Sequence, residues 1–257
     1  KKNIYEIISK TCLDAEDEFK LFNYIKRKKM IFLSTPFSRK AVDRLIKFGV
    51  GAFKIGSGEM NNFPLINYIA KFNKPMIIST GMHSTENVRK LVDFLSKKKT
   101  KFALMHTTNL YPTPNKLVRL NSITELKKNF PNLVIGLSDH TETNHSSLGA
   151  VALGACIIER HFTDTRYREG PDISCSMDPL ELSYIIDRSR EIHKALINPK
   201  SRTKPEEDVY RFARSSIVSD RDLAAGKVIE LEDIWARRPG NGQIPGFDFE
   251  WLLHESS

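Results

Sequence analysis

Residues 75–107 read PMIISTGMHSTENVRKLVDFLSKKKTKFALMHT, and this stretch decides the fold class. It begins and ends with a short apolar run, Pro75–Thr80 and Phe102–Thr107, each near the length of a buried parallel strand. Ser84 is a plausible N-cap for a helix between them. Apolar residues recur there with helical spacing: Val88, Leu91, Val92 and Leu95. The stretch therefore predicts a strand, a crossover helix and a second, parallel strand.

The same alternation continues along most of the chain. Further strand-like runs are Ile31–Thr35, Ala52–Ser57, Val134–Asp139 and Ile157–Phe162. Helices are expected over Asp14–Lys29, along an apolar stripe that stops at Gly49, and from Asp178 onward, where an acid, a proline and Glu181 favour a helix start.

Strict alternation of this kind favours a (β/α)₈ TIM barrel. Only six strands are predicted, so we expect the barrel to lack its first strands in this chain. The alternative is an open doubly wound sheet. That fold would carry a glycine-rich GxGxxG turn, and the sequence has none.

The pattern changes after residue 197. Residues 198–214 begin with a polar stretch that contains Pro199 and Pro205, which predicts a linker. Residues 215–257 are too few to bury a core of their own. The expected organisation is a barrel domain over 1–197, a linker over 198–214 and a partial small domain over 215–257.

Composition limits the function classes. The chain has 257 residues, 40% of them hydrophobic, and a net charge of +9. Its basic runs lie at predicted helix ends without interleaved aromatic residues, so we expect no nucleic-acid partner. Three widely spaced cysteines predict neither disulfides nor a metal knuckle, and no apolar run could span a membrane. We therefore expect a cytoplasmic protein.

Reactive side chains stand where predicted strands end, which is where parallel barrels build their active sites. His140 and His161 end neighbouring runs, so they could share a divalent ion or form a metal-free hydrogen-bonded pair. Lys54 lies inside an apolar run, where it could bind an anion, form a Schiff base, or pair with Glu59 or another acid. Three serines follow the same pattern: Ser57, Ser79 and Ser138.

Six motifs stand in the same order as in the N-acetylneuraminate (sialic acid) synthases, of which the legionaminic and pseudaminic acid synthases are close relatives. They are KIGSGE, STGM, HTTNLYPTP, GLSDHT, ALGACIIERHFTD and GPDISCSMD. The IWARRPGNG segment resembles the start of that family's C-terminal antifreeze-like (SAF) domain. The resemblance implies a TIM barrel followed by such a domain. The family's first barrel motifs have no counterpart here.

The resemblance also implies a function: a C–C bond-forming transferase that condenses phosphoenolpyruvate with N-acetylmannosamine or a related N-acetylated amino sugar. Phosphoenolpyruvate would be held by Lys54, Ser57, Ser79, Asn109 and Ser138, with Thr35 close by. Tyr111 and Asp172 would face the sugar. His140 and His161 would hold the metal, Mn²⁺ before Mg²⁺ or Co²⁺.

The catalytic residues implied are Glu59, beside the reacting carbons, Lys54 and His161. Arg238 would enter the barrel of a partner chain in a domain-swapped homodimer. Two other functions stay open from the sequence. One is a Schiff-base aldolase that uses Lys54, and the other is a non-catalytic sugar-phosphate-binding remnant of a synthase.

Overall fold

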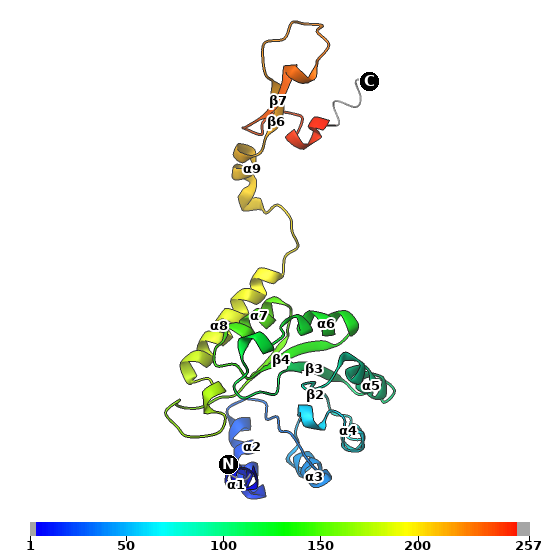
Figure 1. The fold of residues 1–257 in the computed structure, drawn as a ribbon, viewed down its shortest axis with the longest axis vertical. Coiled ribbons are helices and arrows are strands. Elements are labelled where there is room, and N and C mark those ends of the chain that lie inside the picture. Colours follow the sequence, from blue (N-terminus) through cyan, green and yellow to red (C-terminus); the bar gives the residue numbers. More distant parts are fainter. Residues whose placement is uncertain (1–3, 251–257) are drawn as a thin grey trace. The chain divides into compact units, whose positions relative to one another are not determined.

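The computed structural model describes residues 4–250, which divide into two compact units, 4–197 and 198–250. Each unit has its own sheet, and Figure 1 labels the elements of both. In the described part of the chain, no helix combines the length and the apolarity needed to cross a bilayer.

The first unit is built on a parallel sheet whose strands are neighbours in chain order (Figure 1). Its strands are β1 Phe53–Ile55, β2 Met76–Ser79, β3 Phe102–Thr107, β4 Val134–Asp139 and β5 Ile157–Arg160. A helix follows each strand and runs back toward the amino ends of the strands, as expected for parallel pairing. The sheet curls like part of a barrel wall, and residues 4–250 form five strands of it rather than a closed barrel.

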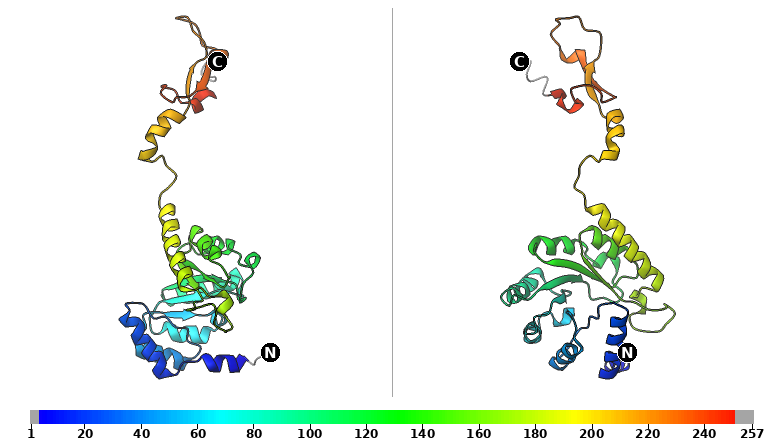
Figure 2. Two further views of the ribbon diagram at one scale, coloured as in Figure 1. Left: turned by 90° about the vertical axis from the view of Figure 1, so that its left-hand side faces the viewer. Right: turned by 180° about the vertical axis from the view of Figure 1, so that it is seen from behind.

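Helices lie along one side of this sheet (Figures 1 and 2). The helices of the unit are α1 Ile4–Thr11, α2 Ala15–Arg27, α3 Arg39–Phe48, α4 Phe63–Ala70, α5 Thr85–Ser96, α6 Asn121–Asn129, α7 His145–Ala152 and α8 Pro179–Leu196. The predicted starts of α5 and α8 are confirmed. Ser84 accepts a hydrogen bond from the Asn87 amide, and Asp178 forms a reciprocal capping box with Glu181.

The core fills the space between sheet and helices. The largest fully buried side chains include Phe53, Ile55, Met76, Ile78 and Leu104. Truncating one of them to alanine would cost about 2–5 kcal/mol, because the cavity left behind closes only in part.

One predicted strand does not form. Residues 31–35 run beside β1, and the Lys54 amide donates a hydrogen bond to the Ser34 carbonyl at 3.1 Å, but no ladder of strand hydrogen bonds forms among the described residues. Ile31 is 86% exposed and Leu33 is also exposed, so of the apolar side chains that suggested a strand only Phe32 packs on the core, beside Phe22. β5 is also shorter than predicted. It ends at Arg160, and Phe162 forms only an isolated parallel bridge with Met177.

The second unit contains a helix, α9 Glu207–Ala213, and an antiparallel pair, β6 Ser216–Ser219 and β7 Ile234–Arg237. α9 and a short 3₁₀ turn before it occupy 204–213, so much of the predicted linker is helical. Asp233 is buried in this unit and pairs with Arg221 and Lys227. The end of the predicted small domain, residues 251–257, lies outside the described residues.

Candidate active site

The carboxyl ends of β1 to β5 bring the predicted site residues of the first unit to one edge of the sheet. Lys54 lies in β1, Ser79 ends β2, and Ser138 lies in β4. His140 and His161 follow β4 and β5 by one residue each. Because parallel strands end at the same edge, these side chains line one mouth. They form two groups with different chemistry.

The first group, here called the anion corner, consists of Lys54, Ser57, Ser79 and Asn109. The buried Lys54 ammonium donates to Ser79 Oγ at 2.7 Å. It also pairs with a carboxylate, Glu159 Oε2, at 3.3 Å. The ion pair with Glu59 that the sequence allowed does not form, because the Glu59 carboxylate accepts from Asn62 Nδ2 at 2.6 Å.

Gly81 brings the other members of the anion corner together. Its amide donates to Ser57 Oγ at 3.1 Å. A Cβ at this position would overlap Asn109 Oδ1 and lie 2.8 Å from Ser57 Oγ, so only glycine allows this approach. Among the described residues, the buried Asn109 Oδ1 has no hydrogen-bond partner. Thr35 lies nearby, against Gly56. The corner thus offers an ammonium, hydroxyls and an amide to a ligand.

The second group, the histidine corner, consists of Tyr111, His140, His161 and Asp172. The two imidazole centroids are 5.3 Å apart, with the rings nearly perpendicular. Tyr111 stacks on His140 at 4.2 Å and meets the edge of His161 at 5.6 Å. Asp172 Oδ2 lies 3.5 Å from His161 Nδ1. Strand-end histidines and loop residues therefore meet as the motifs predicted.

The tautomer of His140 follows from its partner. His140 Nδ1 lies 2.9 Å from the Thr108 carbonyl, which can only accept, so Nδ1 carries the hydrogen and a neutral ring leaves Nε2 with its lone pair. Burial lowers the pKa of His140, and the Thr108 carbonyl opposes this in part. Burial also raises the pKa of Tyr111, with the Asp172 charge adding to the effect.

This chemistry fits a divalent ion. His140 Nε2 keeps a lone pair and faces the Ser138 hydroxyl at 3.5 Å, and Asp172 stands behind His161 as an outer carboxylate, which is the usual support for a metal-binding imidazole. Within residues 4–250, no group of three or more His, Cys, Asp and Glu side chains forms a ready metal site. An ion held by the two histidines would complete its shell with water or substrate oxygens, as in open catalytic sites.

Glu159 links the two corners, and our sequence reasoning missed it. Besides Lys54, it contacts Ser138 Oγ at 3.5 Å, and Ser138 lies 3.5 Å from His140 Nε2. The signal was present, since Glu159 interrupts the apolar run of β5 as Lys54 interrupts that of β1. Ser138 and Glu159 are also register partners on neighbouring strands.

The histidine of β3 and one predicted site residue, Arg238, belong to neither corner. His106 is buried and its Nε2 contacts the Val118 carbonyl at 2.7 Å, a structural role. Arg238 is exposed in the second unit, where it precedes a cis proline. Its predicted entry into a partner's mouth therefore stays a prediction.

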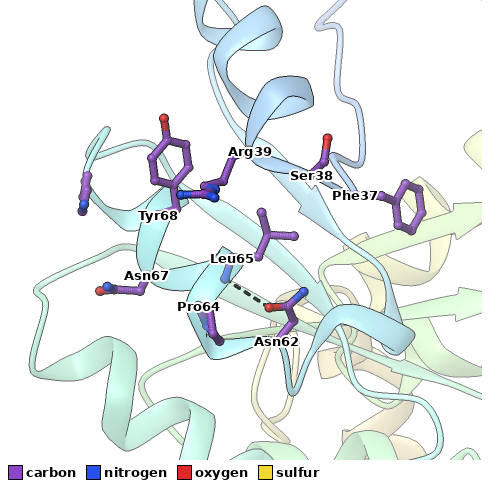
Figure 3. Close-up of a pocket in the computed structure, with 9 residues that line it drawn as sticks. Phe37, Ser38, Arg39, Asn62, Pro64, Leu65, Asn67 and Tyr68 are labelled. Atoms are coloured by element: carbon purple, nitrogen blue, oxygen red, sulfur yellow. Dashed lines mark hydrogen bonds between the residues drawn. The ribbon is translucent and has the colours of Figure 1, made fainter.

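A separate polar cavity of about 550 Å³ lies between the start of α3 and the length of α4 (Figure 3). Arg39 and Tyr68 flank one side of it, and Asn62 closes another. Asn62 caps α4 by accepting from the Leu65 amide at 3.1 Å, and the same side chain holds Glu59. Glu59 is thus tied to a helix start at this cavity rather than to Lys54.

The fold and the two corners give the class first: a TIM-barrel-like α/β protein with a buried lysine, serine hydroxyls and two histidines at its strand ends. The crystal structure of a sialic acid synthetase from Leptospira borgpetersenii, in complex with citrate, matches with a TM-score of 0.76 and 29% identity. The match covers 79% of this chain and 72% of that one.

Sequence comparison then gives the family. N,N'-diacetyllegionaminic acid synthase of Campylobacter jejuni is 38% identical over 252 residues, 96% of this chain and 75% of that protein. Pseudaminic acid synthase of the same species is 30% identical over 258 residues, 100% of this chain and 75% of that protein. Residues 1–201 match the NeuB family. The chain belongs to the NeuB family, whose named relatives here are synthases of sialic acid and similar sugars.

Proposed function

We propose that this chain condenses phosphoenolpyruvate with an N-acetylated amino sugar, such as N-acetylmannosamine, to a nonulosonic acid and phosphate. The observation that carries the proposal is the pairing of two unlike corners in one mouth. A buried lysine among hydroxyls stands on one side and two imidazoles stand on the other, joined by Glu159 and Ser138. An anionic enol donor and an aldehyde acceptor need these two kinds of group.

In the proposed reaction the anion corner holds phosphoenolpyruvate. The Lys54 ammonium faces a carboxylate or phosphate oxygen, and the Ser57 and Ser79 hydroxyls donate further hydrogen bonds. These groups are already oriented by their buried surroundings, so little reorganisation is needed as charge shifts. Asn109 lines the same corner, and its amide NH₂ would donate to the anion.

The histidine corner receives the open-chain amino sugar. Tyr111 and Asp172 contact its hydroxyl groups, and His140 and His161 would hold a divalent ion, with Mn²⁺ preferred to Mg²⁺ or Co²⁺. Such an ion, when bound, supplies Lewis-acid polarisation of an aldehyde oxygen. His140 stays neutral for this role because burial lowers its pKa.

The proposed reaction forms one C–C bond and breaks the C–O bond to phosphate. The enol carbon C3 of phosphoenolpyruvate forms a bond to the aldehyde carbon, whose oxygen takes up a proton. Water adds to the cationic C2 and loses a proton. The resulting tetrahedral centre expels phosphate by C–O cleavage and becomes the keto group. Two carboxylates can orient the water: Glu59, held by Asn62, and Glu159, held between the corners.

The test is a phosphate-release assay with phosphoenolpyruvate and a panel of N-acetylated amino sugars. We expect release that depends on both substrates, stops with a chelator and returns with Mn²⁺. A reduced pyruvyl adduct on Lys54 after borohydride treatment would instead identify a Schiff-base aldolase. Calorimetric binding of phosphoenolpyruvate without turnover would identify a sugar-phosphate-binding remnant.

We also propose that the protein works as a domain-swapped homodimer in which Arg238 acts in the partner's mouth. A guanidinium suits this role, since its fork makes two hydrogen bonds to sugar oxygens. Arg238→Ala and His161→Ala chains should each be nearly inactive, and co-expression should restore part of the activity in heterodimers. If heterodimers form and remain inactive, Arg238 does not act in trans.

A further inference from the structure

Arg160, at the end of β5, has a guanidinium that the proposed reaction does not use. Its side chain is only 1% exposed. One terminal nitrogen donates to the Thr141 carbonyl at 2.7 Å and faces the Cys175 carbonyl at 3.5 Å. The other donates to the Thr143 carbonyl and to Asn144 Oδ1 at 3.2 Å, and lies 3.4 Å from Asp139 Oδ2.

These acceptors belong to the segments that carry the histidine corner. Asp139 and Thr141 are the chain neighbours of His140, and Arg160 itself precedes His161. Cys175 lies in the turn that begins after Asp172, the carboxylate facing His161. The Arg160 guanidinium therefore connects three segments: the backbone after His140, the end of β5 before His161, and the turn that follows Asp172.

The contact geometry suits arginine alone. Asp139 is the only acid in the contact set, and its two oxygens already accept from the Thr141 amide at 2.9 Å and Ser147 Oγ at 2.6 Å. Most of the guanidinium contacts go to carbonyl oxygens, which spread over two loops and need a planar fork of donors. A lysine could also neutralise the Asp139 carboxylate, but its single ammonium group could not donate to all of these acceptors at once.

We infer that Arg160 is the positioning residue that fixes the separation and orientation of His140 and His161. The inference rests on the proposed function, because it assigns the two imidazoles a joint ligand role. Arg160 touches neither the substrate nor the ion in this scheme. It acts through the backbone that presents the two rings.

The test compares Arg160→Lys with Arg44→Lys in the full chain. Arg44 is the matched control, because it pairs with the largely buried Glu18 between α2 and α3 at 2.6 Å, away from the mouth. Imidazole ¹⁵N resonances give a readout that needs neither metal nor turnover. We expect Arg160→Lys to disturb the His140 and His161 resonances, including the Nδ1–H signal of His140, and Arg44→Lys to leave them unchanged.

Mn²⁺ titration followed by electron paramagnetic resonance gives the second readout. We expect about 10–100-fold weaker Mn²⁺ binding in Arg160→Lys, the usual effect of losing outer support for metal ligands. The KM for phosphoenolpyruvate should hardly change, since the anion corner is intact. Unchanged imidazole resonances in a folded Arg160→Lys chain would overturn the inference, whatever its melting temperature. Failure of the proposed function appears separately, as absence of Mn²⁺-dependent phosphate release in the unmutated chain.

Discussion

The two corners of the mouth are built in different ways. Lys54 and Ser79 of the anion corner lie within strands, and their side chains are buried against the sheet. In the histidine corner, His140 and His161 stand just past strand ends, while Tyr111 and Asp172 lie in loops. Tyr111 is 46% exposed and the His161 side chain 32% exposed. The lysine and one serine of the anion corner are thus held by strands, whereas Ser57, Asn109 and all of the histidine corner stand on connections between elements.

This difference matches the two jobs proposed for the mouth. A common anionic donor can be held by a fixed set of groups, whereas an acceptor that differs between enzymes is better met by loop residues. The relatives named above are synthases of different products, legionaminic and pseudaminic acid. We therefore expect changes in the anion corner to affect all acceptors alike and changes in the histidine corner to depend on the acceptor.

The largest effect is expected from Lys54→Met, which removes the charge while keeping much of the side-chain volume. It should lower kcat/KM by about a thousandfold with every acceptor, because a preorganised charge next to the reacting anion is lost. Lys71→Met, in the lining of the cavity beside α4, is the control and should have little effect. Steady-state phosphate release measures both. A loss that varies with the acceptor would contradict the separation of the corners.

His161→Ala should come next. Its side chain is partly exposed, so the free energy of unfolding should change by no more than about 0.5 kcal/mol. Turnover should fall about a hundredfold, with weaker Mn²⁺ binding and an unchanged Kd for phosphoenolpyruvate. Calorimetry with each ligand separates the two affinities. Wild-type Mn²⁺ affinity in this variant would remove His161 from the metal site.

Glu159→Gln tests the bridge between the corners. The carboxylate beside Lys54 competes with any anion that binds there, so its neutralisation should leave the KM for phosphoenolpyruvate equal or lower. We expect kcat to fall about tenfold, because the amide cannot accept a proton from water. The same measurements on Glu59→Gln show which carboxylate matters. If only Glu59→Gln lowers kcat, then Glu159 serves only to hold Lys54.

The smallest effect concerns pH and stability. Burial lowers the pKa of His106 and His140, so the unfolded chain binds more protons than the folded chain below about pH 6.5. The free energy of unfolding is therefore highest at neutral pH and falls as the pH drops below about 6.5. The loss is at most about 1.4 kcal/mol per pH unit for each histidine. Urea midpoints at several pH values measure it. His140→Gln, which can still donate to the Thr108 carbonyl, should flatten the dependence.

Much of this organisation was predictable from sequence. Helix caps such as Ser84 and Asp178 are local signals, and the strand ends follow from apolar runs, so the positions of Lys54, His140 and His161 on one edge could be inferred. Residues 31–35 misled because their pattern is that of a strand. Strand formation depends on pairing and packing as well as on pattern, and Ile31 and Leu33 are exposed.

The contacts of the two acidic residues could not be predicted in the same way. A lysine in an apolar strand requires a partner, but the sequence does not say which acid supplies it. Glu59 is five residues away and looked suitable, yet Asn62 at the start of α4 holds its carboxylate. Glu159 is distant in sequence and reaches Lys54 because the curled sheet brings both side chains to the mouth. Such long-range pairs need the three-dimensional structure.

Gly81 carries a consequence for the history of genes of this kind. A single base change in the second position of a glycine codon gives alanine, valine, aspartate or glutamate, and each of these would displace the Asn109 side chain. The Asn109 side chain can rotate away, so such a chain should still fold and be expressed, but Asn109 would no longer line the anion corner. A gene copy released from selection could therefore lose its chemistry at this codon long before it loses its protein. Among duplicated copies, a residue other than glycine at this position would mark a chain whose anion corner is displaced.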